Sequence, residues 1–375
     1  MQSQSTQRIF QISYLRAFLT LLVVIHHSVL AYFSIKPPQW WGAVPVSDSV
    51  KWPGFDLLAG WNDIFFMALM FLVSGLFVWP GLQRYGAGRY IGRRLLRLGV
   101  PFAVGAGLLA PLAYYPAYLE RGGAPSLGSY TSSWLGLGAW PAGPMWFLWV
   151  LLVFDCIVAI SFTTFPRIVE AIARFVGRMS QRPMRLFLLL GTMSWVVYAP
   201  LSMHFGSLTW WGWGPFAVQT SRVLHYFIYF AAGVCLGASG GLGEFFERTG
   251  RLARQWWGWC LLSAVMFTFT IWCVRSGNGT AGRIGFAFSC AASSLFVTAL
   301  VVRFVRSSRW ADSLSANAYG IYLVHYVFVI WIQYLALQWL IPAFEKGLAV
   351  SLAAVTASWM TTALLRQGKI IAHVI

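Results

Sequence analysis

The chain has 375 residues, of which 58% are hydrophobic, 17% aromatic and only 10% charged. A water-soluble domain of this length carries roughly a quarter charged residues, so the composition excludes an ordinary soluble protein. The formal net charge of +17 would suit a nucleic-acid partner, but the basic residues fall in short clusters between long apolar runs. That pattern is typical of membrane topology, and we expect a lipid bilayer and no nucleic acid as a partner.

Ten apolar segments are long enough to cross ~30 Å of hydrocarbon. The first of them is too long for a signal-peptide core and lacks a small-residue cleavage site, so we expect it to stay in the protein. The sequence therefore predicts an all-α, polytopic membrane bundle of about ten transmembrane helices. The expected spans are 12–33, 61–80, 96–118, 144–165, 185–203, 224–240, 256–275, 282–302, 317–340 and 347–366.

The basic residues are divided unequally between the two sides of such a bundle. With the N-terminus inside, 20 of the 27 Lys and Arg residues lie on one side, and an odd number of spans would destroy this asymmetry. The positive-inside rule then predicts that both termini are cytoplasmic. The other side holds Lys36, Lys51, Arg121, Arg222, Arg275, Arg283 and Lys346.

Two of the expected external loops are rich in aromatic residues, glycine and proline. They are 34–60, with Pro37, Pro38, Trp40, Trp41 and Trp52, and 204–223, with Trp210, Trp211 and Trp213. Interfacial belts explain such tryptophans. The alternative is that their flat indole faces stack on sugar rings.

The first span carries ionisable groups, which are costly in hydrocarbon and therefore candidates for function. Eleven residues separate Arg16 from His27, which is three helical turns plus about 20°, so both side chains share a face roughly 16 Å apart along the axis. His26 is rotated about 80° from that face and is expected to serve packing or hydrogen bonding. The alternative is that Arg16 only snorkels to the headgroups while both histidines face a polar interface.

The second span begins at the outer side with Trp61, Asn62 and Asp63. Asn62 or Asp63 could lie level with His27, where an amide or carboxylate would fix its tautomer and raise its basicity. A plain interfacial role for Asp63 is the alternative.

Three further polar residues fall within or at the ends of spans. His225 opens the sixth span from outside and could line the same cavity as His27. His325 lies mid-span and should face the bundle interior, either as a wall of the site or in a structural hydrogen bond. Asp155 is an intramembrane acid for which the sequence names no partner.

A cluster of arginines, Arg89, Arg93, Arg94 and Arg97, marks the expected cytoplasmic entrance of the third span. Positive-inside anchoring alone explains it. A phosphate-rich co-substrate arriving from the cytoplasm would also need such a cluster.

No Walker, Gly-x-Ser-x-Gly or His-Glu-x-x-His motif is present, and the five cysteines, all in apolar stretches, have no Cys-x-x-Cys spacing. We therefore expect no metal site.

Several segments resemble, in order and spacing, the acyltransferase-3 family of membrane acyltransferases, and in particular the branch that contains periplasmic-glucan succinyltransferases. They are Arg16 with His27, residues 71–75 (Phe-Leu-Val-Ser-Gly), 94–101 (Arg-Leu-Leu-Arg-Leu-Gly-Val-Pro), 143–148 (Gly-Pro-Met-Trp-Phe-Leu), 226–233 (Tyr-Phe-Ile-Tyr-Phe-Ala-Ala-Gly) and 319–325 (Tyr-Gly-Ile-Tyr-Leu-Val-His).

The resemblance implies a ten-helix core that moves an acyl group, acetyl or succinyl, from cytoplasmic acyl-coenzyme A to a hydroxyl of an extracytoplasmic glycan, at the inner membrane. It implies that Arg16 and His27 are the functional pair, with acyl-coenzyme A as co-substrate and no permanently bound cofactor. We expect one integral membrane domain over residues 1–375 without an appended soluble domain, so a separate esterase or transferase partner stays open.

In this hypothesis Arg16, Arg94 and Arg97, with Arg93 beside them, hold the donor's phosphates, for which a guanidinium is well suited. His27 acts as general base or as a transient acyl carrier. Asp63 completes the catalytic set, and the substrate-binding residues are Asn62, His225, His325 and Trp146. The rival is a proton-coupled transporter or flippase of a glycan or small metabolite, with Arg16, His27, Asp155 and His325 along its path.

Overall fold

Long apolar helices form most of this protein, because in hydrocarbon every backbone N–H and C=O needs a partner within the chain. The structure is a computed structural model that describes residues 2–35, 46–240 and 242–368. Within those ranges nine helical segments are long and apolar enough to cross a membrane. The expected all-α membrane bundle is confirmed.

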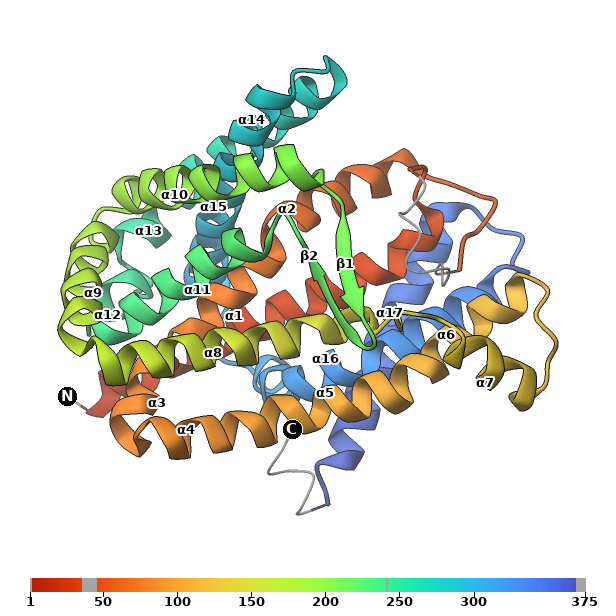
Figure 1. Cartoon of the computed structure of the whole chain (residues 1–375). Helices are drawn as coiled ribbons and strands as arrows, with labels where there is room; N and C mark the ends of the chain where they lie inside the picture. Colours follow the sequence, from red (N-terminus) through yellow and green to blue (C-terminus); the bar gives the residue numbers. More distant parts are fainter. Residues whose placement is uncertain (1, 36–45, 241, 369–375) are drawn as a thin grey trace.

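The elements are labelled as in Figure 1. In chain order they are α1 (Gln2–Val29), η1 (Leu30–Tyr32), α2 (Pro53–Gly75), α3 (Val78–Tyr85), α4 (Ala87–Arg94), η2 (Leu95–Gly99), α5 (Val100–Val104), η3 (Gly105–Leu109), α6 (Ala110–Glu120), α7 (Leu127–Leu135), η4 (Gly143–Met145), α8 (Trp146–Thr164), α9 (Pro166–Ser180), α10 (Pro183–Phe205), β1 (Trp210–Trp213), β2 (Phe216–Gln219), α11 (Val223–Ala238), α12 (Leu242–Phe245), α13 (Arg251–Arg254), α14 (Trp256–Arg275), α15 (Gly279–Phe304), α16 (Arg309–Ala336) and α17 (Ala343–Leu365).

The sixth expected span, 224–240, differs from the other nine. Its place is taken by α11, an apolar helix of 16 residues. At 1.5 Å per residue this helix is about 24 Å long, less than the ~30 Å of a hydrocarbon core. It packs against α2, α9 and α10, and it is a tenth apolar helical segment beside the nine longer ones of the described residues.

The third span is not a regular helix. Its 34 residues, Ala87–Glu120, pass through two π-helical turns, η2 and η3. Pro101 has no N–H to give to the carbonyl of Arg97 four residues earlier, and the Tyr319 hydroxyl donates to that carbonyl instead. The irregular turn therefore fastens the arginine segment to α16.

Helix α1 lies inside the bundle, where it packs against α2, α15, α16 and α17 (Figure 1). Its continuous run from Gln2 to Val29 carries both Arg16 and His27 on one helix. The face that bears these two residues is turned toward α16, whose Tyr319 and His325 are their neighbours. The polar stripe of the first span is thus directed at protein rather than at lipid.

Close contact between α2 and α11 depends on glycine. A Cβ on Gly233 would lie 2.0 Å from the Leu72 carbonyl oxygen, and one on Gly75 would lie 2.3 Å from the Phe230 carbonyl oxygen. Only residues without a side chain allow the two backbones to approach this closely. This contact explains why the 71–75 and 226–233 segments both end in glycine.

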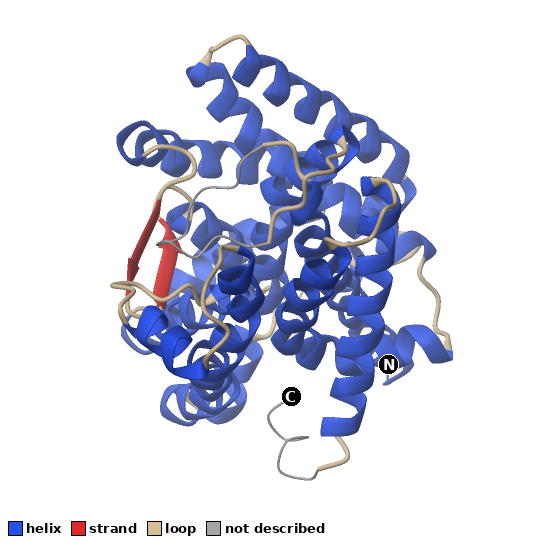
Figure 2. Ribbon diagram, turned by 90° about the vertical axis from the view of Figure 1, so that its right-hand side faces the viewer, coloured by secondary structure: helices blue, strands red, loops and turns tan. Residues whose placement is uncertain are grey.

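The segment 204–223, expected to be an external loop, contains the two-stranded antiparallel hairpin β1–β2, which stands out against the helices in Figure 2. The Trp149 indole on α8 donates to the Ala217 carbonyl at 2.9 Å and so fixes β2 to the bundle. Of the other aromatic loop, Pro37, Pro38, Trp40 and Trp41 lie outside the described residues.

An ion pair fastens the segment before α2. Lys346 on α17 donates to the Asp48 carboxylate at 2.7 Å, and both side chains are buried. Lys51 donates to the Ala31 carbonyl at 3.0 Å, and partial burial lowers the pKa of its ammonium group.

In Figure 1 the arginine-bearing helices α3, α4 and α9 lie toward the end where the N-terminus lies, and α7 lies at the opposite end.

Candidate functional site

His27 lies beside a second histidine on another helix. Its Nδ1 is 2.8 Å from the Val23 carbonyl oxygen and 3.3 Å from Nε2 of His325, and the two rings are 5.2 Å apart. The Tyr326 ring meets His27 edge-on, also at 5.2 Å. Two imidazoles and a phenol therefore gather where α1 crosses α16.

The hydrogen bonds assign a tautomer to each histidine. The carbonyl of Tyr322 accepts from Nδ1 of His325 at 2.7 Å, so the Nε2 of His325 carries the lone pair. The carbonyl of Val23 accepts from Nδ1 of His27, whose proton also faces that lone pair. This leaves the Nε2 of His27 as the basic nitrogen.

Gln333 fixes the end of α1 that holds this histidine. Its side-chain nitrogen donates to the carbonyls of His27 and Ser28 at 2.8 and 2.9 Å. These carbonyls lie in the last turn of the helix, where no N–H of the next turn can reach them. The amide on α16 therefore holds the His27 backbone against α16.

A cavity of ≈ 310 Å³ opens among α1, α2, α4, η2, α8 and α16. Three guanidinium groups, those of Arg16, Arg94 and Arg97, line it. Its other walls combine hydroxyl groups with apolar and aromatic side chains. They are Thr20, Met70, Ser74, Phe77, Leu98, Phe147, Leu148, Leu151, Ala318, Tyr319 and Tyr322. We call this the arginine cavity.

The intramembrane acid Asp155 has its partner in the arginine cavity. Arg94 donates from Nε to the fully buried Asp155 carboxylate at 2.5 Å, and the Tyr90 hydroxyl donates to the other oxygen at 2.9 Å. Nη2 of Arg94 is buried and has no hydrogen-bond partner among the described residues. One carboxylate thus orients Arg94 and balances one of the three positive charges.

The arginine cavity ends before it reaches His27. Its described lining stops at Thr20 on α1 and at Tyr322 on α16. The Tyr322 ring lies 5.9 Å from the His325 ring, so one aromatic ring separates the cavity from the histidine pair. The space around Arg16 is therefore open, and the Tyr322 ring closes it before His27.

The turn at η4 holds the tyrosines of α16. The carbonyl of Pro144 accepts a hydrogen bond from the Tyr322 hydroxyl. Gly143 has φ +54, and a Cβ there would lie 2.9 Å from the Tyr326 ring. The Gly-Pro pair at 143–144 therefore places both rings beside His325.

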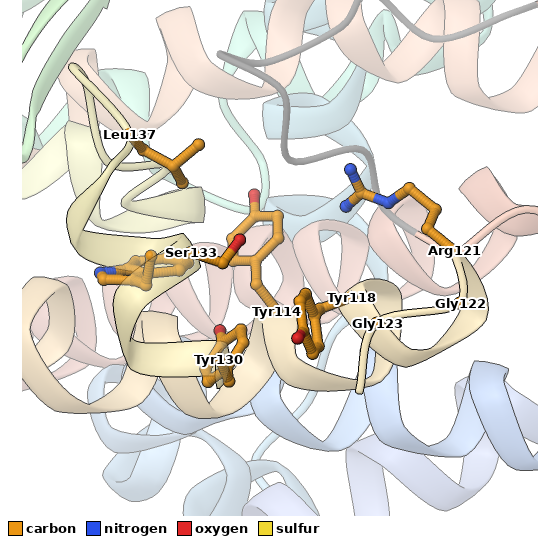
Figure 3. Close-up of a pocket in the computed structure, with 9 residues that line it drawn as sticks. Tyr114, Tyr118, Arg121, Gly122, Gly123, Tyr130, Ser133 and Leu137 are labelled. Atoms are coloured by element: carbon orange, nitrogen blue, oxygen red, sulfur yellow. The ribbon is translucent and has the colours of Figure 1, made fainter. Parts of the chain in front are cut away.

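A second cavity, of ≈ 220 Å³, lies between α6 and α7 (Figure 3). Aromatic side chains make up most of its walls, and Arg121 and Ser133 add polar groups. Its lining is Tyr114, Tyr118, Arg121, Gly122, Gly123, Tyr130, Ser133, Trp134 and Leu137. We call this the tyrosine cavity.

The structure does not bring Asp63 to the imidazole of His27. The Asp63 carboxylate accepts from Arg222 at 2.8 Å, and the Asp63 carbonyl accepts from the same guanidinium at 3.0 Å. Asn62 is fully buried on α2. The contacts that orient the His27 ring come instead from the Val23 carbonyl, one turn earlier on α1, and from His325 on α16.

His26 is directed to a different helix from His27. Its ring packs against Phe66 of α2 at 5.0 Å, which agrees with the 80° rotation expected from the helix period. Packing is thus the observed environment of His26.

Three other expected site residues line neither cavity. His225 is fully buried, with Nε2 3.5 Å from the Cys290 thiol and its ring against Tyr229. Trp146 packs against Tyr226 in the aromatic core, 5.6 Å between ring centres. Arg93 stacks over Tyr85 at 4.2 Å, outside the arginine cavity.

Sequence reasoning missed Tyr319, Tyr322, Tyr326 and Gln333 as members of the site. All four lie on α16 with His325, at positions that face α1 or the cavities. The sequence signal for them was a run of polar-tipped residues inside one long apolar helix.

In the part of the chain that the structure describes, no three His, Cys, Asp or Glu side chains gather to hold a metal.

Compared with models of known protein families, residues 9–363 match an acyltransferase domain, that of acyltransferase family 3. The match covers every element of the site, from Arg16 to Gln333. No curated protein and no solved structure matches this sequence.

Proposed function

Because the chain belongs to the acyltransferase-3 family of membrane acyltransferases, we propose that it moves an acyl group from acyl-coenzyme A to a hydroxyl of an extracytoplasmic glycan. The observation that carries this proposal is the arginine cavity, which ends one aromatic ring short of the histidine pair. The resemblance to the family and to its glucan succinyltransferase branch makes acetyl and succinyl the first acyl groups to test.

The donor is identified by charge. Arg16, Arg94 and Arg97 line one cavity, and the buried Asp155 carboxylate pairs with Arg94 alone among these three. Two positive charges in a largely apolar wall are costly unless an anion joins them. Guanidinium groups bind phosphate oxygens in pairs, so a phosphate-bearing thioester such as acyl-coenzyme A suits the cavity.

The length of the donor is compatible with the separation between Arg16 and His27. Arg16 and His27 are roughly 16 Å apart along the axis of α1, at 1.5 Å per residue. A flexible pantetheine arm held by its phosphates near Arg16 would extend past Thr20 and displace the Tyr322 ring. The thioester carbonyl would then lie beside the Nε2 of His27.

The chemistry follows from the tautomers. The Nε2 of His27 takes the proton of the acceptor hydroxyl as its oxygen attacks the thioester carbonyl. The new C–O bond forms, the C–S bond breaks, and the coenzyme A thiolate leaves and receives a proton. His325 faces Nδ1 of His27 with a lone pair, which stabilises the imidazolium that forms.

Orientation rests on the distribution of charge. Of the 27 Lys and Arg residues, 20 lie on the expected inner side, which favours a cytoplasmic entrance to the arginine cavity and cytoplasmic termini. In this proposal the protein is in the inner membrane, and an esterase or transferase partner can act on the acylated glycan.

The test is acyl transfer by purified protein with acetyl- or succinyl-coenzyme A and glycan from the source organism. Wild-type protein is expected to consume thioester and acylate the glycan. His27→Ala is expected to lose about 10²–10⁴-fold in rate while staying folded. Unchanged acylation by His27→Ala would refute the role of His27.

A proton-coupled transporter or flippase is the second candidate, because a carrier also needs polar groups inside the bundle. It predicts substrate flux in reconstituted vesicles. Flux without thermal stabilisation or thioester cleavage by either donor would favour the carrier over the enzyme.

A further inference from the structure

The donor and the histidine pair leave the tyrosine cavity unused. Figure 3 shows Tyr114, Tyr118 and Tyr130 grouped between Ser133 and Leu137 on one side and Arg121 on the other. At ≈ 220 Å³ it is smaller than the 300–1,000 Å³ typical of drug-sized ligands. Its size therefore suits one ring-sized group rather than a long chain.

The lining has the chemistry of a sugar site. Aromatic faces offer broad apolar contact to the C–H face of a pyranose, while tyrosine hydroxyls and the Ser133 hydroxyl offer hydrogen bonds to its edge. Tyr114, Tyr130 and Trp134 are nearly buried, and Tyr118 is half-buried. These rings are held by one another, since Tyr118 and Tyr130 are 5.1 Å apart and Tyr130 and Trp134 are 6.0 Å apart.

The cavity is joined to the histidine pair by two tyrosines. The hydroxyl of Tyr114, which lines the cavity, lies 3.2 Å from the hydroxyl of Tyr326. The Tyr326 ring in turn packs edge-on against His27. The tyrosine cavity thus adjoins the histidine pair through Tyr114 and Tyr326, and the arginine cavity adjoins it through Tyr322. Tyr319, Tyr322, His325 and Tyr326 all lie on α16.

We propose that the tyrosine cavity binds a pyranose ring of the acceptor glycan and presents one of its hydroxyls to His27 past Tyr326. This inference rests on the proposed function. It favours the tyrosine cavity over the hairpin tryptophans as the sugar platform, because Trp211 and Trp213 are 53% and 69% exposed and line neither cavity.

Two variants change the tyrosine cavity in opposite ways. Tyr118→Ala removes a stacking face, and Ser133→Trp fills the space without removing a buried side chain. Tyr118→Phe keeps the ring and serves as the conservative variant. Trp272→Ala is the matched control, because Trp272 is 61% exposed at the end of α14 and lines neither cavity.

The assay follows labelled acyl groups from acetyl- and succinyl-coenzyme A into glycan released from the source organism's envelope. Tyr118→Ala and Ser133→Trp are expected to raise the KM for glycan about tenfold or more, with the KM for donor and the rate of donor hydrolysis unchanged. Trp272→Ala is expected to match the wild type, whereas Tyr118→Phe, which keeps the ring and loses the hydroxyl, is expected to raise the KM for glycan less than Tyr118→Ala does.

The outcomes separate the two proposals. If wild-type protein transfers acyl groups and both cavity variants keep the wild-type KM for glycan, the sugar site is overturned while the proposed function stands. If wild-type protein transfers no acyl group from either donor, the proposed function fails and this inference fails with it.

Discussion

At the scale of single residues, the basic nitrogen of His27 is set by its neighbours. Val23 and His325 both engage Nδ1, so that Nε2 keeps its lone pair. His325 touches His27 rather than a cavity, which makes it a positioning residue. Its loss should change how His27 works and leave donor binding alone.

We expect His325→Ala to lower kcat at least about tenfold, because the Nδ1 proton of His27 loses its second acceptor and the imidazolium its support. The KM for acyl-coenzyme A should stay at the wild-type value, since the arginine cavity is untouched. The pH at which kcat is half-maximal should shift as well. His204→Ala, at the exposed end of α10, is the control. A rise in donor KM that matches the fall in kcat would contradict a positioning role.

The pair formed by Arg94 and Asp155 gives a second test. Asp155→Leu leaves the Arg94 charge uncompensated, and removal of one partner from a buried ion pair costs about 3–5 kcal/mol. We expect thermal unfolding in detergent to show that loss. The double variant Arg94→Leu with Asp155→Leu should regain much of the stability while keeping a raised KM for donor. A double variant as unstable as Asp155→Leu would show that the ion pair is not the cause.

Part of this residue-scale arrangement follows from the sequence alone. The helix period places Arg16 and His27 on one face and turns His26 away, because both residues belong to one regular helix. The partners of His225 and Asp155 could not be predicted, since they come from other helices. Depth in the membrane indicates that Asn62 or Asp63 can lie level with His27, but it does not specify which side of α2 faces α1.

At the scale of elements, glycines decide how closely helices pack. Gly233→Ala would place a Cβ 2.0 Å from the Leu72 carbonyl oxygen, and backbone cannot give way cheaply. We expect a loss of about 1–3 kcal/mol, measured as a lower melting temperature in detergent. Gly258→Ala on α14 meets nothing within 4 Å and should leave the melting temperature unchanged. Equal melting temperatures for both variants would contradict the proposed crossing of α2 and α11.

Hydropathy predicts the helices well because hydrocarbon leaves the backbone few alternatives. It cannot predict the π-helical turns of the third span or the short α11. The first include η2, where the Tyr319 hydroxyl donates to the Arg97 carbonyl, for which Pro101 has no N–H. The second depends on the packing of α11 against α2, which hydropathy does not encode.

At the scale of the whole molecule, two cavities of different chemistry approach one histidine pair. The arginine cavity is cationic, and the tyrosine cavity is aromatic. In Figure 1 the arginine-bearing helices α3 and α4 and the α7 wall of the tyrosine cavity lie toward opposite ends of the bundle. In the proposed function, this arrangement would let a charged donor and a carbohydrate acceptor react without either one crossing the membrane.

The most direct test uses sealed inside-out vesicles of the inner membrane, loaded with glycan and given labelled acetyl- or succinyl-coenzyme A outside. The account predicts acylated glycan inside vesicles that carry the wild-type protein and none with His27→Ala, although both hold equal amounts of folded protein. Acylation that requires donor and glycan on the same side, or that persists in His27→Ala, would contradict it.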